Sequence, residues 1–162
     1  LYKKHHVEPV VWVFLEVAPF GDLSLFIEFY TKKYPNRVLK TIVNNMKFAK
    51  NIRNAAAHSN PMLVNLFSVE DFLLHPTQSV VSEASLMHID SKLLNDMKIH
   101  DLVALFYLNK LLTSDTARKH FYDHGKNVLD RFNRHSEYYL TLATIKQFKE
   151  IFGNLVDYQL TT

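Results

Sequence analysis

A short polar cluster near the end of a predicted helix has the residue types to act on a phosphate group. It comprises Arg53, Asn54 and His58, in the run Arg-Asn-Ala-Ala-Ala-His. A guanidinium is always charged and binds phosphate oxygens in pairs. An imidazole can accept and donate protons near neutral pH, and the dipole at a helix C-terminus favours its charged form. The cluster therefore suits proton transfer beside a phosphate, with Asn54 able to orient the imidazole or a phosphate oxygen.

The helix that carries this cluster has a polar seam along one side. At about 100° per residue, six of its side chains fall within about 40° of one line. They are Lys40, Asn44, Lys47, Asn51, Asn54 and His58. A solvated helix face usually mixes both signs of charge, whereas this seam offers amides, lysines and a histidine. The seam is therefore expected to be a hydrogen-bonding surface.

Arg53 is the exception, because it lies about 140° from His58, among apolar positions. A buried unpaired charge costs several kcal/mol, so Arg53 must reach the surface or meet an anion. The segment Val-Val-Trp-Val-Phe-Leu-Glu-Val-Ala contains one charge, Glu16. We predict that Glu16 pairs with Arg53. The alternative is that Glu16 faces water at the end of its own helix.

The rest of the chain is also helical in pattern, and its three Gly and five Pro leave little material for hairpins. Pro9 opens a helix that is apolar on every side and should be central and buried. Residues 68–71 begin a short helix that Pro76 ends, and residues 78–89 are ambiguous, with 79–82 extended as one option. Further helices are predicted over residues 23–33, 39–57, 91–112, 114–134 and 145–152, the last stopped by Gly153.

The composition fits one globular domain over residues 1–162, with 48% hydrophobic residues. The net charge of +3 permits a nucleic-acid partner without requiring one. The absence of cysteine excludes disulfides and suits a reducing cytoplasm. The apolar run 10–18 is too short to span a membrane, so we expect no membrane partner. Since the chain begins at Leu1, we expect it to be a segment of a longer protein.

The N-terminal third resembles a known family. The pattern W-x3-E-x3-F-G-x-L-S is followed at a typical interval by Arg53-Asn54-x3-His58. The first pattern is carried by Trp12, Glu16, Phe20, Gly21, Leu23 and Ser24. Together they are similar to the Abi-like (abortive infection) branch of the HEPN ribonuclease superfamily, over roughly the first 65 residues. That branch usually continues with a second His, a basic residue and an Asn; here Ser59 replaces the His and Asn65 comes one residue late.

The resemblance implies an all-α HEPN-like helical bundle, with additional C-terminal helices in this chain. It also implies a cytoplasmic, metal-independent endoribonuclease acting in anti-phage abortive infection or as a toxin. Arg53, Asn54 and His58 would be catalytic, Glu16 would support them, and Lys47, Lys50 and Asn51 would bind RNA. HEPN ribonucleases pair two such helices, so the resemblance implies a homodimer with a composite site. An antitoxin or regulatory protein is a further expected partner.

Two other functions stay open on the sequence. The chain could be a catalytically inactive helical module that a partner protein binds. It could also be a regulator that binds RNA through Lys40, Lys47 and Lys50 without cutting it. No cofactor is expected, because the histidines show no metal-ligand spacing. A second Arg–His pair, Arg118 and His124, lies in a lysine-rich helix and is interpreted as ordinary surface.

Overall fold

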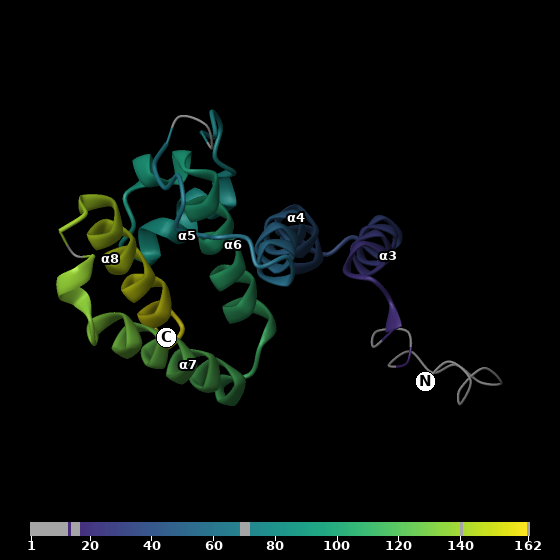
Figure 1. Ribbon diagram of the computed structural model, residues 1–162. Coiled ribbons are helices and arrows are strands. Elements are labelled where there is room, and N and C mark those ends of the chain that lie inside the picture. The colour runs from purple at the N-terminus through teal and green to yellow at the C-terminus, as the bar shows by residue number, and fades with distance from the viewer. Residues whose placement is uncertain (1–12, 14–16, 69–71, 140, 162) are drawn as a thin grey trace.

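The computed structural model describes residues 13, 17–68, 72–139 and 141–161. The fold is all-α, and the described residues form no strand, only one isolated bridge between Phe72 and Asp96. The elements are α3 (Phe20–Lys33), α4 (Arg37–Ala57), α5 (Gln78–Leu86), η1 (Ser91–Asn95), α6 (Met97–Leu112), α7 (Asp115–Asn133), η2 (Ser136–Tyr138) and α8 (Ala143–Tyr158) (Figure 1).

Helix α4 lies between α3 on one side and α6 on the other (Figure 1). Against α3 and the end of α6 it buries Ile42, Met46 and Ala49, which pack with Leu108. Its remaining buried apolar residue, Phe48, joins the main core with α5, α6 and α8. Two neighbours therefore cover two of its sides.

Helix α6 is the central helix of the described part of the chain. Its buried residues go around the helix rather than along one stripe: Ile99, His100, Asp101, Leu102, Val103, Ala104, Phe106 and Leu108. A helix that is apolar on all sides is buried by its neighbours. The sequence predicts a central, buried position for the helix after Pro9 instead, and most of that helix lies outside the described residues.

The predicted helix boundaries are confirmed for α3, α4 and α7 to within a few residues. Asn36 begins α4, since its side chain accepts hydrogen bonds from the N–H groups of Val38 and Leu39. Ser114 begins α7 in the same way, by accepting from Ala117. The single helix predicted over residues 91–112 is divided into η1, which Asp90 caps, and α6, which Asp96 caps.

The structure decides one segment that was ambiguous in the sequence, and it contradicts one expectation. Residues 79–82 are helical, within α5, because Val80 and Ala84 are fully buried on one face of that helix. Gly153 does not end the last helix, which continues to Tyr158. A glycine inside a helix costs only about 1 kcal/mol, and burial of Leu155 and Val156 beyond it offsets that cost.

The segment between α4 and α5 is attached to the start of α6 by Asp96. One carboxylate oxygen caps α6 by accepting from the N–H groups of Lys98 and Ile99, at 2.9 and 3.0 Å. The other oxygen accepts from the N–H of Phe67 at 2.6 Å. Because Asp96 is buried, these bonds fix the position of the loop relative to the first turn of α6. Together they form one wall of the hollow described below.

The packing of α7 on α8 gives the first testable prediction. A Cβ added to Gly125 of α7 would lie 2.5 and 2.9 Å from the two methyl carbons of Val156 of α8. We expect Gly125→Ala to lower the free energy of unfolding by about 1–3 kcal/mol, because overpacking displaces a buried side chain. Urea-induced unfolding would measure the loss.

Gly153→Ala is the matched control. A Cβ at Gly153 meets nothing within 4 Å, and the residue is inside α8. This change should raise the free energy of unfolding by about 0.5–1 kcal/mol, the helix preference of Ala over Gly. Val156→Ala in the Gly125→Ala background should restore part of the loss. Equal stability of the two glycine variants would contradict the close α7–α8 contact.

Candidate active site

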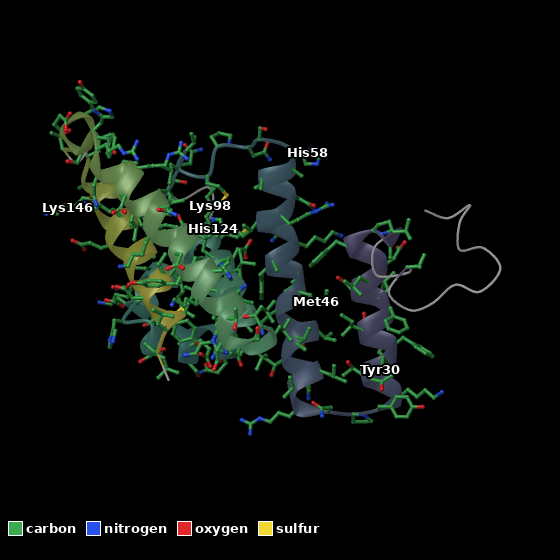
Figure 2. The ribbon with its side chains drawn as sticks, turned by 90° about the horizontal axis from the view of Figure 1, so that it is seen from below. Tyr30, Met46, His58, Lys98, His124 and Lys146 are labelled. Carbon is green, nitrogen blue, oxygen red and sulfur yellow. The ribbon has the colours of Figure 1, made fainter. Side chains whose placement is uncertain are left out.

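The predicted Arg–His cluster lies at the C-terminal end of α4. Arg53 is exposed, and its Nη1 donates to the side-chain oxygen of Asn54 at 3.1 Å. His58 is the exposed C-cap residue. Figure 2 shows His58 at the tip of the helix, beyond Met46 in its middle. The three predicted catalytic residues therefore share one accessible helix end.

The end of α4 is a Schellman motif, and this motif fixes the position of His58. Ser59 has a positive φ of 53°. Its N–H donates to the carbonyl of Ala56, and the N–H of Asn60 donates to Ala55 at 2.8 Å. The predicted stop at Ser59-Asn60-Pro61 is confirmed. The chain consequently turns back beside Ala55 directly after the histidine.

The predicted seam is the open face of α4. Five of its six members are exposed and Asn54 is half-buried. Residues on the other sides of the helix, such as Ile42, Asn45 and Ala49, are buried. The seam therefore connects Lys40, near the start of α4, with His58 at its end along a surface that solvent reaches.

Two hollows flank the seam. The α3-side hollow has a volume of about 400 Å³, with Lys47 and Lys50 on one wall. Its other residues are Gly21, Asp22, Ser24, Leu25, Glu28, Val43 and Met46. The α6-side hollow has a volume of about 320 Å³ and is lined by Asn51, Ile52, Ala55, Asn60, Pro61, Met62, Met97, Lys98 and Asp101. The three residues predicted to bind RNA are thus divided between the two hollows.

Asn51 is held by a residue that the sequence analysis missed. Its Nδ2 donates to Oδ2 of Asp101 at 2.9 Å, and Asp101 is only 3% exposed. The contact joins α4 to α6 across a separation of 50 residues. The available signal was the pair His100-Asp101, two polar residues between the apolar residues Ile99 and Leu102.

Asp101 belongs to a buried polar chain. The N–H of Thr77 donates to Nε2 of His100 at 3.2 Å, so Nδ1 carries the proton in the neutral ring. That Nδ1 lies 3.5 Å from the second oxygen of Asp101. The ring is fully buried and lies edge-on to Phe48, with centroids 4.4 Å apart. His100 is fully buried and cannot touch a substrate, and its Nδ1 lies near Asp101 without a hydrogen bond between them.

A second cluster of titratable side chains lies toward the opposite end of α4. The Tyr158 hydroxyl donates to Glu83 at 2.6 Å, which links α8 to α5. Burial raises the pKa of Tyr158, and the neighbouring Glu83 carboxylate adds to the rise. Burial also raises the pKa of Tyr107 and lowers that of Lys110. These shifts keep the hydroxyl groups neutral, as suits a structural contact between helices.

The second Arg–His pair does not form a site. Arg118 donates to the carbonyl oxygens of Lys110 and Thr113 and also pairs with Asp115. It therefore satisfies the carbonyls at the end of α6, which lack partners within that helix. His124 is exposed, six residues further along α7. The interpretation of this pair as non-catalytic fits these contacts.

Three further expectations concern an ion pair, metal binding and membrane spanning. Glu16 lies outside the described residues, so its pairing with Arg53 stays a prediction. Among residues 17–68, 72–139 and 141–161, no three His, Asp or Glu side chains gather closely enough to hold a metal ion. Nor does any helix in these ranges have the length and apolar character needed to cross a membrane.

The chain thus combines an all-α fold with an Arg-Asn-x3-His motif at an accessible helix end, and a known family shares part of its sequence. Residues 1–64 match the model of the family described as Abi-like protein. The match confirms the predicted resemblance to the Abi-like family over this part of the chain and ends just beyond the Schellman motif, while membership of the HEPN superfamily stays a prediction. No curated protein and no solved structure gives a significant match.

The bond between Asn51 and Asp101 gives the second prediction. Asn51→Ala would leave a buried carboxylate oxygen without its donor. We expect a loss of about 1–3 kcal/mol in the free energy of unfolding, the cost of an unsatisfied buried acceptor. Asn44→Ala, an exposed position on the same seam, should change it by no more than about 0.5 kcal/mol. If urea unfolding gave equal values, the bond would contribute nothing to stability.

Proposed function

We propose that this protein is a metal-independent endoribonuclease of the HEPN, Abi-like type that acts in abortive infection. The observation that carries the proposal is the cluster of Arg53, Asn54 and His58, with the arginine and the histidine exposed, within residues 1–64 that match the Abi-like family. The family match supports an abortive-infection role. The chemistry of the cluster supports ribonuclease activity.

RNA can be cut by its own 2′-hydroxyl, and the reaction needs only proton transfer and charge stabilisation. His58 would take the 2′-hydroxyl proton as the 2′-oxygen attacks phosphorus. The bond from phosphorus to the 5′-oxygen then breaks, and that oxygen receives a proton. Arg53 would stabilise the negative charge that grows on the phosphate oxygens. The products are a 2′,3′-cyclic phosphate and a 5′-hydroxyl.

One imidazole cannot act on both sides of phosphorus at once, because the 2′-oxygen and the leaving 5′-oxygen lie opposite each other. A second His58, from another copy of the chain, would supply the missing proton transfer. The exposed, Asn-rich seam is suited to such pairing around a polar groove. We propose a two-fold symmetric dimer, the commonest arrangement among homo-oligomers.

The third prediction concerns metal and His58. Cleavage of a single-stranded RNA should persist in excess EDTA, because the proposed chemistry uses side chains alone. His58→Ala should slow it by about 10²–10⁴-fold, the usual contribution of an acid–base group. His124→Ala is the matched control, an exposed histidine outside the cluster, and it should cut at the wild-type rate. Products with a 5′-phosphate, or a requirement for magnesium, would contradict the mechanism.

The fourth prediction tests the shared site. Wild-type chain is mixed with an excess of His58→Ala chain, and activity per wild-type chain is measured before and after subunit exchange. A composite site predicts that activity collapses after exchange, since most wild-type chains then face an inactive partner. Constant activity would mean that each chain carries a complete site.

A non-cleaving regulator is the second candidate, and the α3-side hollow is the observation in its favour. Lys47 and Lys50 both line it, next to Asp22 and Glu28. RNA binding that weakens steeply with salt, with no cleavage by the wild type, would select this function. An inactive module for an antitoxin-like partner would show neither binding nor cleavage.

A further inference from the structure

The α6-side hollow has the composition of a site for a flat, partly polar group. Its walls include the apolar side chains of Ile52, Met62 and Met97, with Pro61 beside them. Polar groups come from Asn51, Asn60, Lys98 and Asp101. Sites for small organic groups combine mainly apolar walls with a few placed hydrogen-bonding groups.

The hollow opens within one helical turn of the proposed catalytic histidine. Ala55 lies three residues before His58 and forms part of the floor. The Schellman motif turns the chain at Ser59, and the bond from Asn60 N–H to Ala55 places Asn60 and Pro61 beside that floor. A group bound here would therefore lie next to a phosphate at His58.

Asn51 is the oriented recognition group of this hollow. Because its Nδ2 donates to the buried Asp101 carboxylate, the amide cannot rotate by half a turn without setting two oxygens against each other. Its Oδ1 is therefore fixed as an acceptor, with a second N–H beside it. Such an amide edge can pair with the adjacent donor and acceptor atoms on the edge of an unpaired base.

We propose that the α6-side hollow binds one unpaired nucleobase of a single-stranded RNA, from the nucleotide next to the phosphate held by Arg53 and His58. The inference rests on the proposed function and adds the part of the substrate that is recognised. Lys47 and Lys50 line the opposite, α3-side hollow, where they would meet the phosphate backbone. Backbone contacts position a strand, whereas base contacts distinguish sequences.

The test measures binding separately from cleavage. In the full chain carrying His58→Ala, fluorescence anisotropy gives the affinity for labelled eight-nucleotide RNAs of each base and for an RNA of the same length without bases. Ala55→Leu fills the floor of the hollow. It should weaken binding of the preferred base-bearing RNA by about tenfold, the value of one well-paired base edge, and leave the baseless RNA unaffected.

Ala56→Leu is the matched control, an exposed neighbour in the same helical turn that does not line the hollow. It should bind both kinds of RNA like the parent chain, and Ala55→Ser should keep the base preference. The proposal is overturned if Ala55→Leu binds like the parent, or if it weakens both kinds of RNA equally.

The two proposals fail in different ways. If the wild type does not cut RNA but Ala55→Leu still removes the base-dependent part of binding, the nucleobase site stands and the cleavage mechanism falls. If the wild type cuts RNA and Ala55→Leu leaves base-dependent binding and cleavage unchanged, the nucleobase site falls alone.

Discussion

The packing of α4 on two neighbours is the constraint on which the rest of the structure depends. One side of the helix must be apolar for α3, and another must fit the central helix α6. Only one strip of its surface remains for function. The polar side chains of the seam occupy that strip, from Lys40 to His58, and the two hollows lie where residues of α4 meet those of its neighbours. The position of the candidate site therefore follows from the packing.

Much of α4 could be predicted because its signals are local. Asn36 marks the start, Ser59-Asn60-Pro61 marks the end, and a 3.6-residue period separates polar from apolar positions. Helix α5 was ambiguous, since nine residues give too little period to distinguish a helix from a strand. The helix end predicted at Gly153 was wrong for a related reason, because α8 is stabilised by packing against other helices, which the local sequence does not show.

The hollow beside His58 could not be predicted, because its walls come from distant parts of the chain. Asn51 and Ala55 belong to the Abi-like residues 1–64, whereas Met97, Lys98 and Asp101 lie beyond them. No sequence pattern joins Asn51 to Asp101. The family match thus covers the proposed catalytic residues and one wall of the hollow, and the more C-terminal residues of this chain supply the other wall. If the proposed nucleobase site exists, residues from inside and outside the family match would therefore set its substrate preference together.

Helices α4 and α6 are in contact but far apart in the sequence, and this distance along the chain has a consequence for synthesis of the protein. Asn51 and Asp101 are 50 residues apart, and Phe48 packs on His100. During translation, α4 emerges well before the helix that covers its apolar side. Until α6 has left the ribosome, the exposed Phe48 and Ile52 have no core to join, and α4 alone is a marginal helix in water. The finished site can therefore assemble only late in translation, after the first turns of α6 are available.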